Sequence, residues 1–383
     1  MRIWLARIYI SVADIGRRAT RRELKLSRLQ KIRNQLQQHN LDALLVSQEE
    51  NRRYLSGFTG SDGWLFISEN QAYLLVDFRY VEQAKRETKG FEIQQLQGNI
   101  TALLPQIASG LHCKAIGFEA MTTSFAFYSK LCESLKNMDP GYKLIPTNNL
   151  VELIRIIKEP EELELIQKAS ALTDAALNYA RSLLRPGMKE CEVAWMLEKH
   201  MREAGSEAIP FEIIVASGAN AALPHARSSQ QEICEGQPIV IDMGAKVNGY
   251  CSDCTRTYYL GTEDATFRRI YDTVLGAQLA ALTTITAGMR GPDADKTARS
   301  LIDTAGHSNQ FGHGLGHGVG LAVHELPRLS PLSNDTLDNS MVFTVEPGIY
   351  ISGWGGVRIE DTVVLENGII KTLTKTDKMA LLN

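Results

Sequence analysis

The stretch IDMGAKVNGYCSDCTRT, Ile241 to Thr257, contains two aspartates on either side of an Asn-Gly pair. Asn-Gly is a strong signal for a two-residue β-hairpin turn. If Asn248-Gly249 forms that turn, Asp242 lies opposite Thr255, and Asp242 and Asp253 point from the same face of the hairpin. As diagonal neighbours they would lie about 7–8 Å apart at Cα. Two carboxylates on one face repel each other, so they indicate either a bound cation or two solvated aspartates on an edge hairpin.

A second hairpin repeats this feature with glutamates. The stretch VEPGIYISGWGGVRIE ends at Glu360 and contains Glu346, with a glycine-rich turn over residues 352–356 between them. The two glutamates are an even number of residues apart, so they share a face if no bulge intervenes. A carboxylate pair on each of two hairpins indicates one shared acidic site.

The stretch FGHGLGHGVG, Phe311 to Gly320, carries glycine at every second position. A helix is disfavoured because each glycine costs about 1 kcal/mol relative to alanine. In an extended chain the glycines face one way, where a neighbouring backbone can approach closely, and His313 and His317 face the other. Carboxylates with an imidazole suit Mn²⁺, Fe²⁺, Co²⁺ or Zn²⁺. Four carboxylates are balanced better by two divalent ions than by one.

The pattern along the chain predicts two parts. A helix is expected over residues 24–40, followed by strands near 41–47, 63–68, 72–78 and 115–119, which indicates an α/β domain. From Glu161 onward the order helix, helix, hairpin occurs twice, which indicates an internal duplication. We expect an N-terminal extension over residues 1–22, a first domain over 23–155 and a second over 156–383.

Composition excludes several classes of protein. The chain has 383 residues, of which 44% are hydrophobic, and a formal net charge of -3. This charge argues against a nucleic-acid partner, which would need a basic face. A transmembrane helix needs a run of about 18 apolar residues, and the sequence has none. We therefore expect neither a nucleic-acid nor a membrane partner.

The six cysteines are typical of reduced thiols in a cytoplasmic protein. Cys251 and Cys254 form a lone C-x-x-C, which we interpret as two ordinary cysteines rather than a redox pair or half a zinc site, because no second pair follows. The first 22 residues hold six arginines. Arg7 interrupts their apolar stretch, so an extension, or a start codon placed too early, is favoured over a secretory signal.

Several motifs together resemble one family, the pita-bread metallopeptidases, in the branch of Xaa-Pro aminopeptidase and Xaa-Pro dipeptidase (prolidase). Besides the two hairpins, they are LPHA (Leu223–Ala226), GHGLGHGVGLAVHE (Gly312–Glu325), EPGIY (Glu346–Tyr350) and GGVRIED (Gly355–Asp361). The resemblance implies an α+β fold: a pita-bread catalytic domain with pseudo-twofold halves, preceded by a smaller α/β domain of the creatinase/prolidase type.

The resemblance also implies the site residues. The family's metal ligands fall on Asp242, Asp253, His317, Glu346 and Glu360. Its catalytic residues fall on Glu346 as general base and on His225 and His324, and its substrate-binding residues on His313 and Arg358. It implies two divalent metal ions, for which we expect Mn²⁺ with Co²⁺, Fe²⁺ or Zn²⁺ as alternatives. It further implies a proline-containing peptide substrate and a homodimer in the cytoplasm.

Competing hypotheses remain at this stage. Creatinase uses the same fold without metal, and some pita-bread domains are non-catalytic binding modules; the complete ligand set argues against both. A methionine aminopeptidase is disfavoured because those enzymes usually lack the domain found at Leu24–Leu150. Individual residues also have structural interpretations: Arg358, for example, could simply pair with Asp361. The sequence does not separate aminopeptidase from dipeptidase action.

Overall fold

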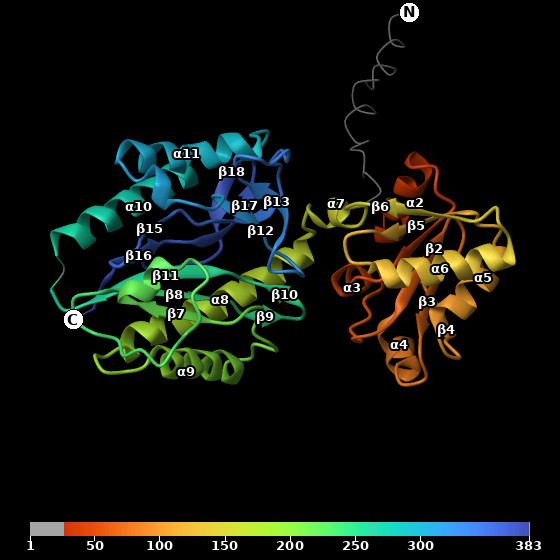
Figure 1. The fold of residues 1–383 in the computed structure, drawn as a ribbon, viewed down its shortest axis with the longest axis horizontal. Helices are drawn as coiled ribbons and strands as arrows, with labels where there is room; N and C mark the ends of the chain where they lie inside the picture. The colour runs from red at the N-terminus through yellow and green to blue at the C-terminus, as the bar shows by residue number, and fades with distance from the viewer. Residues whose placement is uncertain (1–26, 263, 383) are drawn as a thin grey trace, which may run out of the picture. The chain divides into compact units, whose positions relative to one another are not determined.

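The computed structural model of the chain describes residues 27–262 and 264–382 (Figure 1). The predicted N-terminal extension, residues 1–22, lies outside these described residues. By their internal contacts the residues form two units. The first runs to Val46 and resumes over Leu55–Pro146, and the second comprises Ser47–Tyr54 and the chain from Thr147 onward. No helix in the described ranges combines the length and apolar character needed to cross a membrane.

The first unit is built on a mixed sheet with the strand order β4-β3-β2-β1-β5-β6. Its strands are β1 (Ala43–Val46), β2 (Trp64–Ser68), β3 (Ala72–Val76), β4 (Glu92–Gln95), β5 (Ala115–Glu119) and β6 (Lys143–Thr147). β1 pairs in parallel with β5 and antiparallel with β2, and all its residues are buried. A strand covered on both faces needs no polar alternation, which explains its sequence ALLV. The helices are α2 (Arg28–Gln38), α4 (Val81–Glu87), α5 (Ile100–Gly110) and α6 (Phe125–Met138), while α3 (Glu49–Ser56) contributes residues to both units.

The first half of the second unit packs two helices against a sheet with the order β19-β11-β8-β7. The helix α8 begins at Pro160, which suits the first turn, and the Glu162 side chain accepts the Glu159 N–H at 2.8 Å. The elements of this half are α7 (Glu152–Arg155), α8 (Pro160–Leu183), α9 (Glu190–Glu203), β7 (Ile214–Ser217), the 3-10 helix η1 (Gly218–Ala222), β8 (Pro238–Met243), β9 (Lys246–Val247), β10 (Tyr250–Cys251), β11 (Cys254–Leu260) and the C-terminal β19 (Leu381–Leu382).

The second half repeats this order of elements around a sheet with the order β13-β12-β14-β17-β18. Its elements are α10 (Ala265–Thr284), α11 (Gly291–Thr304), η2 (Ser308–Gln310), β12 (Gly316–Gly318), β13 (Glu325–Leu329), β14 (Val342–Val345), β15 (Gly348–Ile351), β16 (Gly355–Arg358), β17 (Asp361–Glu366) and β18 (Ile369–Thr372). In Figure 1 the helices α10 and α11 lie along one side of the strands of this unit and α9 along the other. Helix pairs therefore cover the strands from both sides, which is the arrangement that the duplicated sequence pattern indicates.

The two hairpins have the register that their sequences predict. Asn248 and Gly249 both adopt positive φ, 46° and 82°, as a two-residue hairpin turn of this type requires. Asp242 lies opposite Thr255, which confirms the predicted pairing. In the second hairpin, Val345 pairs with Asp361 and Gly348 pairs with Arg358. The strand register is therefore the same before and after the position of Glu346 and Glu360. The shared face predicted for these glutamates follows from that register.

Candidate metal centre

Three of the predicted metal ligands meet in the second unit. Asp253 immediately precedes β11, His317 lies in β12, and Glu360 lies between β16 and β17. One ligand atom of each residue lies within 4.8 Å of the others. Asp253 and Glu360 are almost completely buried, at 4% and 2% exposure. The fold thus brings an imidazole and two carboxylates from separate stretches of the chain into one buried cluster.

The other two predicted ligands border this cluster. Oε1 of Glu346 lies 3.3 Å from Nε2 of His317, and Oδ2 of Asp253 lies 3.6 Å from the same nitrogen. Asp242 acts electrostatically on Asp253 and on Glu360, and its Oδ2 atom pairs with Arg358. All five residues therefore belong to one electrostatic group.

Burial and mutual repulsion make this cluster unfavourable without a cation. The pKa of Asp253 is raised well above its usual value, first by burial and then by Glu360, Asp242 and Glu346. Burial likewise raises the pKa of Glu360 well above normal, and that of Glu346 is raised mainly by burial as well. The ionised forms therefore gain strongly from a positive partner.

Two carboxylate oxygens support a cation directly. Oδ1 of Asp242 and Oδ1 of Asp253 are buried and have no hydrogen-bond partner among the described residues. A buried polar atom without a partner is costly, and a bound ion would satisfy both atoms. The donor set of four carboxylates and one imidazole matches the ligands that divalent transition metals and Mn²⁺ accept. The residues present thus fit divalent metal ions.

The alternating glycines let β12 carry His317 deep between its neighbours. A side chain at Gly316 would collide with the Thr344 carbonyl oxygen, and one at Gly318 with that of Leu326. At Gly314 a Cβ atom would lie 2.8 Å from the Leu329 carbonyl oxygen. These contacts confirm the predicted close approach, except at Gly312, where a Cβ would meet no atom within 4 Å. Only residues 316–318 form a regular strand, because the chain turns away before and after them.

Of the other histidines, His324 contacts the predicted ligand His317, and His313 contacts Tyr350. The ring of His324 lies 4.3 Å from that of His317, and burial lowers the pKa of His324 to about 4, with His317 and His225 adding to the effect. His225 is exposed, in the loop after η1. His313 contacts the Tyr350 hydroxyl through Nε2 at 2.9 Å and the Gly314 carbonyl through Nδ1 at 2.8 Å.

Arg358 pairs with Asp242 and not with Asp361, so the interpretation of an Arg358–Asp361 pair is wrong. Its Nη2 atom lies 2.5 Å from Oδ2 of Asp242. Asp361 instead pairs with Arg256 and Lys378. Arg358 and Asp361 are three positions apart in the sequence, with Ile359 and Glu360 between them. Side chains three positions apart on an extended chain leave opposite faces, so Asp361 faces away from Arg358.

Sequence reasoning missed three residues that orient the site. The Tyr350 hydroxyl accepts a hydrogen bond from Arg358 and also contacts Nε2 of His313. Burial raises the pKa of Tyr350 to about 12. The hydroxyl groups of Thr255 and Thr344 donate to Glu360 Oε2 at 2.6 Å and Glu346 Oε1 at 3.0 Å. Strand parity places Thr344 and Tyr350 on the face of Glu346, and the first hairpin's register places Thr255 opposite Asp242, but parity does not specify the partners of these three residues.

The C-x-x-C pair has no part in the cluster. Cys251 donates to the Leu321 carbonyl at 3.7 Å and Cys254 to the Glu360 carbonyl at 3.2 Å, so the two thiols serve different segments. All six cysteines are free. The two thiols therefore form no disulfide with each other.

Comparison with known proteins decides the family. The model described as Metallopeptidase family M24 matches residues 164–367, more than half of the chain. The chain belongs to metallopeptidase family M24. A second model, the Creatinase/Prolidase N-terminal domain, matches residues 28–157. The M24 match contains every predicted metal ligand.

Individual M24 relatives cover nearly the whole chain. The solved structure of the Xaa-Pro dipeptidase from Bacillus anthracis is 39% identical with a TM-score of 0.89, over 92% of this chain and 98% of that one. The X-Pro aminopeptidase from Thermotoga maritima is 36% identical with a TM-score of 0.82, over 90% and 97%. The Xaa-Pro dipeptidase of Pyrococcus furiosus is 35% identical over 92% of this chain and 99% of its own length. These matches confirm the predicted fold class, a pita-bread catalytic domain preceded by a smaller α/β domain.

Proposed function

We propose that this M24 protein hydrolyses the peptide bond that precedes proline and releases the residue on its N-terminal side. The main support is the convergence of a complete donor set with two buried carboxylate oxygens, in Asp242 and Asp253, that have no partner among the described residues. The substrate class is supported by relatives named for Xaa-Pro cleavage that are 35% and 39% identical. The proposed metal ligands are Asp242, Asp253, His317, Glu346 and Glu360.

Glu346 is the proposed general base. When bound, divalent ions supply Lewis-acid activation of a water and of the scissile carbonyl. The Thr344 hydroxyl holds Oε1 of Glu346, which leaves Oε2 to receive a proton. Burial raises the pKa of Glu346, which makes its carboxylate a stronger base.

His324 and His225 are the proposed catalytic histidines. Because the pKa of His324 is lowered to about 4, its ring is neutral at physiological pH and can donate one N–H. That N–H would stabilise the oxygen that becomes negative during attack on the carbonyl. His225 is exposed beside His324 and would contact the substrate near the scissile bond.

His313 and Arg358 are proposed to form the side of the site that accepts proline. Both contact the Tyr350 hydroxyl, at 2.9 Å each, so the three side chains form one rigid wall. The nitrogen of a prolyl peptide bond carries no hydrogen, so it offers no N–H for recognition. Selection for proline would therefore depend on how well the shape of this wall fits the proline ring.

The metal, assembly and compartment are further parts of the proposal. We favour two Mn²⁺ ions, with Co²⁺, Fe²⁺ or Zn²⁺ as alternatives, because the donor set accepts all four. Metal analysis of the purified protein checks this. The cytoplasm is supported by six free cysteines. A homodimer follows from the family resemblance, and light scattering of the eluted protein checks it.

The decisive assay offers Ala-Pro, Ala-Pro-Ala and Ala-Ala to the purified protein with Mn²⁺. Release of alanine from the first two but not from Ala-Ala supports an Xaa-Pro aminopeptidase. Cleavage of Ala-Pro alone supports a dipeptidase. Cleavage of none of them by the metal-loaded protein contradicts the proposed function and favours a non-catalytic binding module.

A metal-independent creatinase-like activity is less well supported. That activity needs no cluster of four carboxylates, whose burial raises the pKa of three of them here. Activity that survives extensive treatment with a chelator would favour the metal-independent alternative.

A further inference from the structure

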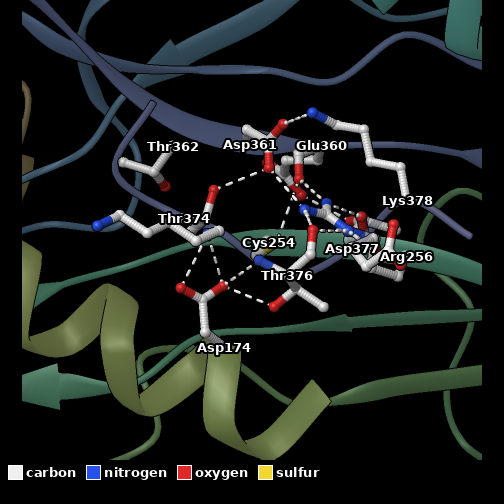
Figure 2. A network of polar contacts seen from close by, with 12 residues as sticks. Asp174, Cys254, Arg256, Glu360, Asp361, Thr362, Thr374, Thr376, Asp377 and Lys378 are labelled. Carbon is white, nitrogen blue, oxygen red and sulfur yellow. Dashed lines mark hydrogen bonds and ion pairs between the residues drawn. The ribbon is translucent and has the colours of Figure 1, made fainter. Parts of the chain in front are cut away.

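Behind the metal cluster lies a buried arginine that no step of the proposed reaction uses. Arg256 follows Thr255 on β11, so its side chain leaves the strand on the face opposite to the Thr255 hydroxyl. Its side chain is 1% exposed, and it is the largest fully buried side chain of the described residues. Figure 2 shows its guanidinium among Glu360, Asp361 and the C-terminal residues Thr376 and Asp377.

Every N–H group of Arg256 has an acceptor. Nη1 donates to the carbonyl oxygens of Glu360 at 2.5 Å and Thr255 at 2.9 Å. Nη2 donates to Oδ1 of Asp361 at 2.7 Å and to the Thr376 carbonyl at 2.7 Å. Nε donates to the carbonyls of Thr376 and Asp377 at 3.2 and 3.3 Å. The planar fork of a guanidinium can join acceptors in this way, and a lysine ammonium cannot.

Two of these acceptors are backbone carbonyls next to the metal cluster, those of Glu360 and Thr255. The Thr255 hydroxyl orients the Glu360 carboxylate at 2.6 Å, and the Glu360 N–H donates back to the Thr255 carbonyl at 3.1 Å. Arg256 therefore holds the main chain of a ligand and the main chain of the residue that orients it. A shift of this guanidinium would move both together.

The same side chain connects the cluster to the segment 374–378. Asp361, which is fully buried, accepts from Arg256 and Thr374 through Oδ1 and from Gln278 and Lys378 through Oδ2. A buried ion pair of this kind often contributes little net stability, because desolvation offsets the attraction. The ion pair would instead contribute by fixing the geometry of Glu360.

We propose that Arg256 is a positioning residue of the metal centre, which fixes the Glu360 carboxylate through the backbone and couples the segment 374–378 to metal binding. The inference rests on the proposed function only in that the five ligands hold a divalent ion. If Arg256 had a purely structural role, its replacement would lower the stability of the metal-free and the metal-bound protein by the same amount and would leave the affinity for metal unchanged.

The first test compares Mn²⁺ binding by wild type and Arg256→Lys with isothermal titration calorimetry. Lysine keeps the charge but loses the fork, so we expect affinity for Mn²⁺ to fall about 10- to 100-fold, the range typical of residues that support metal ligands. The rise in melting temperature on addition of Mn²⁺ should shrink in parallel. Unchanged affinity in a folded Arg256→Lys variant would overturn the inference.

Asp174→Asn is the matched control. Asp174 on α8 accepts from the Lys375 N–H at 2.8 Å and from the Thr376 N–H at 2.9 Å, so it anchors the same segment without touching Arg256 or Glu360 (Figure 2). Asp174→Asn loosens the segment but keeps the contacts of Arg256 with the Glu360 and Thr255 carbonyls. We therefore expect it to lower the melting temperature and to weaken Mn²⁺ binding less than Arg256→Lys does. An equal loss of affinity in both variants would show general destabilisation and overturn the inference.

A measurement on the wild-type protein covers the case in which Arg256→Lys does not fold. Mn²⁺ should slow amide hydrogen exchange in the segment 374–378, and unchanged exchange there would refute the coupling. The outcomes also separate this inference from the proposed function. Wild type that binds Mn²⁺ without cleaving prolyl peptides contradicts the function alone, whereas wild type that binds no divalent ion contradicts both.

Discussion

The Nη2 atom of Arg358 lies 2.5 Å from Oδ2 of Asp242, and this contact gives the acidic cluster a cationic neighbour. The other Asp242 oxygen, Oδ1, has no hydrogen-bond partner among the described residues. One oxygen is thus held by the protein while the other remains to bind metal. Because Arg358 also contacts Tyr350, the orientation of the ligand is linked to the proposed proline side of the site.

Replacement of Arg358 by lysine should therefore reduce catalysis. Lysine cannot contact Asp242, Tyr350 and Thr255 at once as the guanidinium does. We expect kcat/KM for Ala-Pro at saturating Mn²⁺ to fall about 10- to 100-fold. Arg227→Lys, at an arginine side chain that is 87% exposed, is the control and should match wild type. An unchanged kcat/KM in Arg358→Lys would exclude this role.

Removing one carboxylate should stabilise the metal-free protein. The folded-state pKa of Asp253 is raised above its unfolded value, so its ionised form destabilises the fold as pH rises from about 4 through the folded-state pKa. In a chelator at pH 7, Asp253→Asn should melt about 2–4 °C above wild type. The advantage should shrink as the pH falls, and Mn²⁺ should no longer raise the melting temperature. If Asp253→Asn were less stable than metal-free wild type at pH 7, the proposed repulsion between the carboxylates would be contradicted.

Glu325 should contribute an acid-sensitive part of the stability. It is buried with Arg155 and with Lys158, the latter at 2.7 Å, and these cations hold its pKa below the usual value. The sign follows from the lowered pKa: the stabilisation is present above about pH 4.5 and is lost as pH falls through the folded-state pKa.

Glu325→Gln should lower the free energy of unfolding by about 3–5 kcal/mol at pH 7, because it leaves buried cations without their partner. Urea denaturation at pH 7 and at progressively lower pH measures this difference, which should narrow on acidification. A difference that does not depend on pH would contradict an ionic origin.

Glu190 should affect substrate binding more than metal binding. It is fully buried and accepts from the backbone N–H of Ser217 at 2.7 Å and of Ser229 at 3.0 Å, so it holds both ends of the loop that contains His225. Its other partners are the hydroxyls of the same serines and the Asn220 amide. Glutamine would place an N–H₂ group against these donors.

We expect Glu190→Gln to raise KM for Ala-Pro about tenfold, an effect of about 1.4 kcal/mol, with Mn²⁺ affinity unchanged in calorimetry. Glu203→Gln, on the exposed face of the same helix α9, is the matched control. Loss of metal affinity in Glu190→Gln would show that the loop supports the cluster itself.

The sequence predicted most of the second unit's local structure because its signals are local. The Asn248-Gly249 pair set the first hairpin's register, and the alternating glycines indicated the close approach seen at Gly316 and Gly318. The missed residues are of another kind. Tyr350 matters through contacts with His313, 37 positions away, and with Arg358, and no periodicity specifies such partners.

Two-residue periodicity and turn chemistry by themselves determined which carboxylates share a face, since alternation along a strand is a property of the backbone. Only the tertiary structure decided which groups those faces meet. It pairs Arg358 with Asp242 and Arg256 with Asp361, although both arginines lie near several acids in the sequence. The physical reason is that each pairing joins strands more than 100 residues apart, where the packing of whole sheets, and not the local chain, brings the charges together.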